Sequence, residues 1–417
     1  AYHIFAVIIF AAGMVLLPFI HLFMKNNSYP LTYIRTLYAM WLLRTVLSYL
    51  LTYRKSLLIA DQKEYIASIA GLILNITSYG AIILLVTYTQ RYLTALAFNI
   101  VVEVLLNLWI SWYVEKKYPF LHEMRKEKSS PHLTSRIMKD LKSLFISRVS
   151  EKMLNCTDNL IISGFIGVAT VGRYANYSMI TQAIINILTI LANTIQPTIG
   201  DYFTEKNYRR NYEILRQITF VFFGISSVVA VGLFSLITPF VRDIWLGPSY
   251  ELGWGTAVLC IVVLMVRIMG LPLNMVMGVT GLFEKEKNVG ASSAILNLVV
   301  SLALVKPYGM TGVLLGTLVS YLLQICYRYI IFFRDFLQMR EEALRYARDL
   351  GEYLAVMAAE VALMQKVVPI VYGNGGMVLF CICFLLCILV PLALDAVFFG
   401  RGWRLQSIVR MVRGMRR

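Results

Sequence analysis

The stretch MVLFCICFLLCILVPLALDAVFF, residues 377–399, decides the class of fold. A transmembrane helix needs about 20 consecutive apolar residues, and this run is long enough to cross a bilayer. Similar runs recur along the whole chain, so that apolar residues make up 59% of it and charged residues only 15%. Soluble domains contain about 25% charged residues. The sequence therefore predicts an all-α, multi-pass membrane protein.

The apolar runs predict about twelve transmembrane helices, which form a polytopic bundle. The predicted spans are residues 3–24, 31–53, 65–88, 92–114, 141–166, 171–197, 213–240, 254–281, 289–305, 310–333, 350–371 and 377–399. Gly270 and Pro272 are predicted to interrupt the span 254–281, because Pro removes a helical hydrogen bond.

The positions of Lys and Arg predict how the bundle is oriented. The net charge is +16, and cytoplasmic loops of membrane proteins are enriched in Lys and Arg. With both ends in the cytoplasm, every basic cluster falls in a cytoplasmic loop. The outer loops then hold only Lys25, Arg91, Arg173, Arg242 and Lys306. The charge is thus explained without nucleic acid, whose binders place a basic face on a soluble core.

The longest break between spans divides the chain into two lobes. The predicted parts are an N-terminal lobe of four helices (1–114), a basic cytoplasmic linker (115–140), a C-terminal lobe of six helices (141–333), a cytoplasmic segment (334–349), a terminal pair of helices (350–399) and a basic cytoplasmic tail (400–417).

Polar residues repeat at helical spacing inside several spans. Lipid-facing positions are apolar, so such stripes indicate a protein interior or a watery cavity. The stripes are Asn99, Glu103, Asn107 and Ser111 in one span; Arg148, Glu151, Lys152, Asn155, Asp158 and Asn159 in a second; and Gln182, Asn186, Thr189, Asn193 and Gln196 in a third. One reading is that these groups only pair across helices and hold the bundle together.

Basic residues within the spans favour a functional role. Arg44, Arg148, Lys152 and Arg267 lie far from the ends of their spans, and a charge at mid-membrane costs about 3 kcal/mol on insertion scales. We expect more buried cations than anions. Arg makes forked contacts with phosphate oxygens and Lys acts as a point charge, so the pattern predicts an anionic passenger.

Acidic residues in the same stripes have two open roles. Glu103, Glu151 and Asp158 either balance the buried cations or bind a coupling ion, H⁺ or Na⁺. The sequence does not separate these roles. A further charge, Glu360, stands alone in the span 350–371.

The sequence lacks the common motifs of nucleotide-binding proteins, hydrolases and metalloenzymes. It contains no GxxxxGK[ST], GxSxG, HExxH or CxxC pattern, its four histidines are scattered, and its six cysteines lie in apolar runs. We therefore predict no enzyme, no metal site and no cofactor other than a coupling H⁺ or Na⁺.

Two stretches resemble a known family. They are DNLIISGFIGVATVGRYANYSMI (158–180), with its Asp-Asn pair, Val-Gly loop and Tyr-x-x-Tyr helix start, and PFVRDIWLGPSYELG (239–253), with its Trp-Leu-Gly element. They are similar to bacterial polysaccharide biosynthesis proteins, the Wzx-like flippases of the MOP exporter superfamily. That family has fourteen helices, in two six-helix lobes and a terminal pair. The resemblance implies that the chain lacks the family's first two helices.

The resemblance also implies a function. It predicts a flippase of the bacterial cytoplasmic membrane that moves undecaprenyl-diphosphate-linked oligosaccharide outward by alternating access. Membrane lipids and, as further partners, polysaccharide polymerase or assembly proteins are implied. The site residues that we assign on this basis are Arg148 and Lys152 as diphosphate contacts, Arg44 and Arg267 as cavity cations, and Asn155 and Asn186 as sugar contacts.

Three alternatives stay open at this stage. A multidrug or cation antiporter of the related MATE type would use acidic residues to bind its substrate, which the excess of Arg and Lys disfavours. A membrane-embedded polymerase or glycosyltransferase would need a large outer loop, and the sequence predicts none. A scaffold without transport activity would leave the charged stripes unused.

Overall fold

A computed structural model describes residues 2–25, 29–51, 55–61, 63–119, 156–204, 207–373 and 375–400. These residues form helices joined by short turns, and they contain no strand. The chain divides into two compact units, residues 1–140 and 141–417. The all-α prediction is confirmed.

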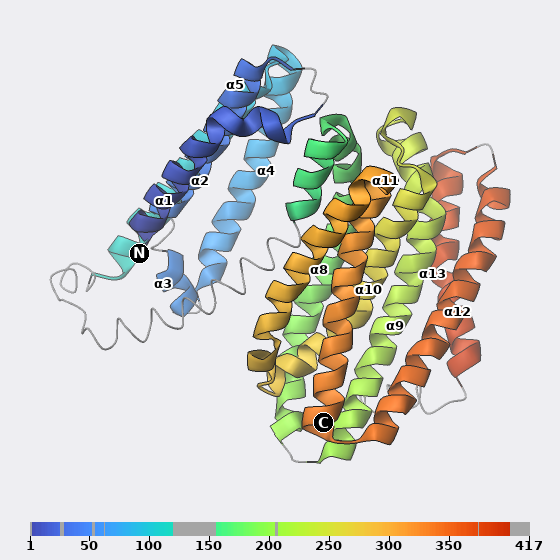
Figure 1. Ribbon diagram of the computed structural model, residues 1–417. Coiled ribbons are helices and arrows are strands. Elements are labelled where there is room, and N and C mark those ends of the chain that lie inside the picture. Colours follow the sequence, from blue (N-terminus) through green and yellow to red (C-terminus); the bar gives the residue numbers. More distant parts are fainter. Residues whose placement is uncertain are drawn as a thin grey trace. The chain divides into compact units, whose positions relative to one another are not determined.

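Unit 1 is built around helix α5, which packs against both α2 and α4 (Figure 1). Helix α1 packs against α2, and the short α3 packs against α4 and α5. The elements are α1 (Tyr2–Leu16), the 3₁₀ helix η1 (Leu17–Phe23), α2 (Leu31–Leu51), α3 (Lys55–Ala60), α4 (Glu64–Thr89) and α5 (Tyr92–Lys117).

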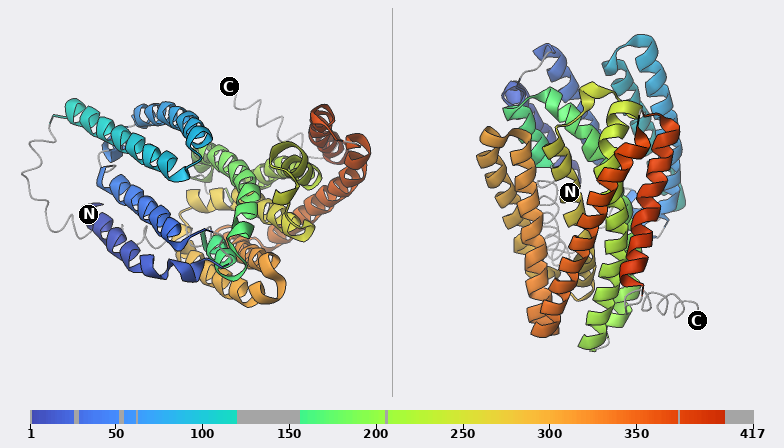
Figure 2. Two further views of the ribbon diagram at one scale, coloured as in Figure 1. Left: turned by 90° about the horizontal axis from the view of Figure 1, so that it is seen from above. Right: turned by 90° about the vertical axis from the view of Figure 1, so that its right-hand side faces the viewer.

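Unit 2 is built around α9 and α10. Helix α10 packs against α8, α9 and α11, and α9 also packs against α12 and α13. Figure 2 shows α12, in orange to orange-red, and α13, in red, beside each other along α9. After helical residues 156–165, the elements are α8 (Val168–Thr204), α9 (Tyr208–Pro239), the π-helical turn η3 (Phe240–Trp245), the 3₁₀ turn η4 (Pro248–Tyr250), α10 (Trp254–Val279), α11 (Phe283–Ile331), the π-helical turn η5 (Phe332–Leu337), α12 (Arg340–Tyr372) and α13 (Met377–Phe399).

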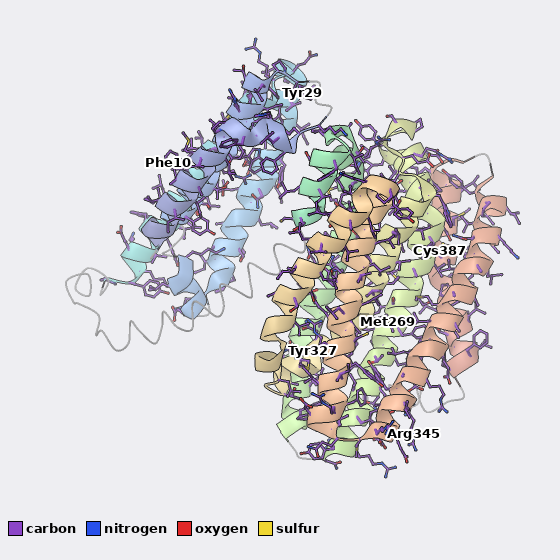
Figure 3. The ribbon with its side chains drawn as sticks, in the orientation of Figure 1. Phe10, Tyr29, Met269, Tyr327, Arg345 and Cys387 are labelled. Atoms are coloured by element: carbon purple, nitrogen blue, oxygen red, sulfur yellow. The ribbon has the colours of Figure 1, made fainter. Side chains whose placement is uncertain are left out.

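The helices have the length and composition of membrane spans. Within the described ranges, nine are long and apolar enough to cross a bilayer. They carry large apolar side chains on their outer surfaces, such as Phe10 on α1 (Figure 3). A helix satisfies its own backbone hydrogen bonds, which lipid cannot do, so these surfaces are suited to contact acyl chains. The chain is a multi-pass membrane protein.

The difference between nine spans and about twelve predicted ones has three sources. Helix α2 is less apolar than the other spans because it contains Arg35 and Arg44. Most of the predicted span 141–166 lies outside the described residues. Helix α11 joins two predicted spans, which Gly309 separates by a non-helical conformation with φ +58° and ψ −135°.

Helix α10 corrects the prediction that Gly270 and Pro272 interrupt their span. The helix is continuous from Trp254 to Val279, and Pro272 is buried inside it. Its neighbours α8, α9 and α11 enclose it, which explains how the missing hydrogen bond is tolerated without a break. A broken helix therefore does not form this part of unit 2.

Aromatic side chains fill the core between α9 and the last two helices. Phe223 of α9 stacks on Tyr353 of α12 with ring centroids 4.5 Å apart, and Phe399 of α13 meets both rings edge-on. Stacked and edge-to-face pairs each add about 0.5–1.5 kcal/mol beyond the burial of their area. This cluster fixes α12 and α13 against α9.

Candidate functional site

Four of the nine predicted site residues lie outside the described residues. They are Arg148, Glu151, Lys152 and Asn155. Their assignment to diphosphate, sugar and coupling ion stays a prediction.

A pocket in unit 2 brings two of the remaining residues together. Asp158 and Arg267 both line it, although they are predicted for different roles. The pocket encloses about 470 Å³ of space, including its open side. Residues 156–165, α8, α10 and α11 all contribute to its walls, which are formed by Asp158, Tyr174, Ser178, Thr181, Gln182, Cys260, Val263, Leu264, Arg267, Leu314, Thr317 and Tyr321.

Asp158 lies at the buried end of a chain of polar groups. Thr317 Oγ1 of α11 is 2.9 Å from both carboxylate oxygens of Asp158 and donates to them. Asn297 Nδ2 in turn donates to Thr317 Oγ1 at 2.9 Å. All three side chains are buried, and Asn297 Oδ1 has no hydrogen-bond partner in the described part of the chain. The carboxylate and this amide oxygen are groups that favour a bound cation.

Arg267 supplies the positive charge of the pocket. It is half-buried on α10, and its guanidinium carbon lies 5.3 Å from the ring centre of Tyr321. Nη2 donates a long hydrogen bond of 3.4 Å to Gln182 Oε1 of α8. Arg carries five N–H donors, and within the described residues Gln182 is the only hydrogen-bond partner that Arg267 has. The guanidinium thus keeps donors for a ligand.

Asn186, predicted as a sugar contact, is exposed on α8 and is not among the residues that line this pocket. Gln182 of the same stripe does line it. One turn of helix separates the two residues, and the pocket lies at the turn nearer the start of α8.

In unit 1, Arg44 and Glu103 form an ion pair. Arg44 Nε of α2 lies 2.5 Å from Glu103 Oε2 of α5, and the guanidinium also stacks over Trp41, 4.8 Å from its ring centre. Ser48 and Asn107 line a small hollow beside the pair. The cation and the anion, predicted for separate roles, neutralise each other here. This agrees with the alternative that such polar groups pair across helices and hold the bundle together.

The buried charges correct a prediction. We expected an excess of buried cations, but within the described residues no Lys or Arg is buried, and the buried acidic side chains are Asp158, Asp349, Glu360 and Asp395. Arg44 and Arg267 are only half-buried. Long basic side chains extend toward water, whereas a short carboxylate is enclosed with its helix. The position of a charge within a span therefore did not reveal its depth in the protein.

One polar stripe was missed by the sequence reasoning. Ser293, Asn297 and Ser301 follow one another at i, i+4 spacing on α11, and all three are completely buried. Ser301 Oγ donates to the carbonyl of Val313 at 3.1 Å, across the bend at Gly309. The spacing that singled out the other stripes is present here as well, and it would have identified Asn297 as a neighbour of the site.

The pocket therefore offers two kinds of contact. Arg267 with the Tyr321 ring and Gln182 is suited to an anionic or sugar-like group, because guanidinium, aromatic and amide groups supply charge, stacking and hydrogen bonds. Asp158 with Thr317 and Asn297 is suited to a small cation or a proton. Such a combination fits binding and transport.

Comparisons with known proteins bear on the family and the fold of the chain. Residues 2–203 match the family model described as polysaccharide biosynthesis protein, which confirms the resemblance seen in the sequence. A solved structure of the lipid II flippase MurJ, in an inward closed conformation, has the same fold with a TM-score of 0.67 and 15% sequence identity. The match covers 96% of this chain and 82% of the flippase. No curated protein sequence matches the chain.

Proposed function

We propose that this chain, whose residues 2–203 match the polysaccharide biosynthesis proteins, is a membrane flippase for a lipid-linked oligosaccharide. The family match carries the proposal, and the fold shared with a lipid II flippase supports it. The proposed activity is movement of a diphosphate-linked oligosaccharide across the bacterial cytoplasmic membrane by alternating access, for surface polysaccharide biosynthesis.

In this proposal Arg267 contacts an anionic part of the substrate. It is the described cation that lines the larger pocket, with its guanidinium next to Tyr321 and Gln182. A fork of N–H donors matches phosphate oxygens, and an aromatic face stacks with a sugar ring. Arg148 and Lys152 are proposed as further diphosphate contacts and Asn155 and Asn186 as sugar contacts.

Asp158 is proposed to bind the coupling ion, either H⁺ or Na⁺. Its carboxylate, Thr317 and the free amide oxygen of Asn297 form a buried cluster beside the substrate pocket. An ion bound there would neutralise a buried charge that otherwise costs several kcal/mol. Substrate and ion would thus share walls formed by the same helices, which is a requirement for coupling. Glu151 is a further candidate for this role.

Complementation of a flippase-deficient bacterium tests the substrate role. The protein is expressed as wild type, Arg267→Ala, Arg267→Lys and Arg345→Ala. Arg345 is exposed near the start of α12 (Figure 3) and serves as the control. Loss of one charged contact of about 1.5–3 kcal/mol corresponds to roughly a 10- to 100-fold loss. We expect Arg267→Ala to lose surface polysaccharide, Arg267→Lys to keep part of it, and Arg345→Ala to match wild type. Full rescue by Arg267→Ala at equal membrane abundance would exclude this role.

A second candidate is a MATE-type multidrug or cation antiporter. It is favoured by one observation, that among the described residues four carboxylic side chains are buried and no Lys or Arg is. Efflux of a cationic dye from cells expressing wild type or Asp158→Asn separates the two functions. Dye efflux that depends on Asp158, without rescue of polysaccharide, would establish the antiporter and overturn the flippase.

A further inference from the structure

Two acidic side chains from different helices lie in contact with α9, far along the chain from the pocket described above. Glu360 projects from α12 and Asp395 from α13, and both helices pack against α9. Glu360 is 1% exposed and Asp395 is 8% exposed. Glu360 contacts Ser227 and Asp395 lies beside Gly224, and these two positions are three residues apart on one face of α9. Two carboxylates are thus enclosed in an otherwise apolar region.

The hydrogen bonds available to these carboxyl groups do not satisfy them. Ser227 Oγ of α9 donates to Glu360 Oε2. Within the described residues, Glu360 Oε1 and both carboxyl oxygens of Asp395 have no hydrogen-bond partner. A Cβ atom built on Gly224 would lie 3.9 Å from Asp395 Oδ2, so Asp395 is directed toward α9. Three buried oxygens therefore require a ligand.

Along α9, α12 and α13, within the described residues, no fixed positive charge is placed to supply it. No ionisable residue lies between Arg216 of α9 and Arg242 of the following turn η3. On α12 the next basic residue is Lys366, which is exposed. The nearest other ionisable groups on the two helices, Tyr353 and Cys387, are each about two turns away, roughly 11 Å. A buried charge without a partner is expensive, so a mobile cation must neutralise this pair.

We propose that Glu360 and Asp395 form a proton-binding pair between α9, α12 and α13. A proton suits the geometry better than Na⁺ does. A hard cation takes about six oxygen ligands, whereas three side chains, Glu360, Asp395 and Ser227, supply oxygens here. One Na⁺ would also leave a net negative charge, while one proton on each carboxyl group leaves none.

Proton binding at this pair affects the packing of the terminal helices. With both carboxyl groups neutral, α12 and α13 stay closed against α9. Loss of the protons leaves two like charges in an apolar contact, which repel each other and require water. The pair thus links proton release to separation of α12 and α13 from α9. This inference stands whether or not the chain moves an oligosaccharide, because it rests on the buried pair alone.

Infrared spectroscopy of the full chain in lipid nanodiscs tests the proposal. Protonated carboxyl groups have a carbonyl stretch distinct from that of carboxylates. We expect this protonated-carboxyl band at neutral pH in wild type. Glu360→Gln or Asp395→Asn should each lose the band intensity of one carboxyl group, and the double variant should lose that of both groups. Glu341→Gln removes an exposed carboxylate, whose side chain is 82% accessible, and should leave the band unchanged. Asp158→Asn identifies any signal from the other buried site.

Any of three outcomes would overturn the proposal. The first is a protonated-carboxyl band that is equal in wild type and in the double variant. The second is displacement of the band by added Na⁺ but not by choline, which would make the pair a sodium site. If a variant fails to fold, wild type labelled with ¹³C-glutamate provides the same test without a mutation. The label shifts the carbonyl band of glutamic acid, and Glu360 is the fully buried glutamate of the described residues. Absence of a shifted glutamic acid band in that sample would also refute the proposal.

Discussion

The ion pair between Arg216 and Asp349 provides a quantitative test of how α9 is held against α12. Arg216 Nη2 lies 2.5 Å from Asp349 Oδ2, and Nε donates to the same oxygen at 2.6 Å. The side chains are 18% and 4% exposed. Replacement of Arg216 by Met removes the cation and leaves a carboxylate buried against the helix.

The expected loss follows from this burial. Removal of one partner from a buried ion pair costs about 3–5 kcal/mol. We take the lower end, about 3 kcal/mol, because Arg216 keeps partial access to solvent and Asp349 has other interactions. At about 2 °C per kcal/mol for a unit of this size, the melting temperature of Arg216→Met should fall by roughly 6 °C.

Thermal unfolding of the purified protein in detergent, followed by intrinsic fluorescence, measures this shift. The double variant Arg216→Met with Asp349→Leu removes both charges and should recover most of the loss, since an apolar replacement of a buried pair is close to neutral. Arg348→Met is the matched control on α12, because Arg348 and Glu352 form an exposed pair 3.9 Å apart. A single variant no less stable than this control, or a double variant as unstable as the sum of the singles, would refute the reasoning.

Three other predictions concern α11, Asp158 and the topology. A Cβ at Gly316 would lie 2.8 Å from the backbone nitrogen of Ser301. Gly316→Ala should therefore lower the free energy of unfolding by about 1–3 kcal/mol in the same unfolding assay. A Cβ at Gly232 would meet no atom within 4 Å, so the control Gly232→Ala should leave this free energy unchanged. Thr317→Val removes the donor to Asp158 and should cost about 2 kcal/mol, whereas Thr317→Ser retains it; equal melting temperatures for the two variants would contradict this. Enzymatic reporters fused to either end of the chain should be active only on the cytoplasmic side, and an active periplasmic reporter would contradict the predicted topology.

The fold class was predictable because it depends on local composition. Runs such as 377–399 contain enough apolar residues to cross a bilayer. Lipid offers the backbone no hydrogen-bond partners, so each run forms a helix, which satisfies its own backbone hydrogen bonds. Even the division of α11 at Gly309 agrees with the boundary between two predicted spans. The interruption of α10 was predicted wrongly, because the neighbours that enclose Pro272 are not visible in its own segment.

The candidate site was predicted only in part. Arg267 and Asp158 stand out as charges in apolar spans, and the structure places both on one pocket. Thr317, which binds Asp158, is an ordinary residue of an apolar span, and 159 positions separate the two. Polarity along one helix indicates that a group needs a partner, but it does not say which helix supplies that partner.

Hydropathy and charge along the sequence thus determined that the chain is a bundle of membrane helices and which residues are costly to bury. The tertiary structure alone decided which of these groups meet. Arg44 is paired with Glu103, whereas Asp395, within the apolar run 377–399, is buried beside the same face of α9 as Glu360. The physical reason is that insertion of each helix depends on its own residues, while the rotation and pairing of helices depend on packing between segments far apart in the chain.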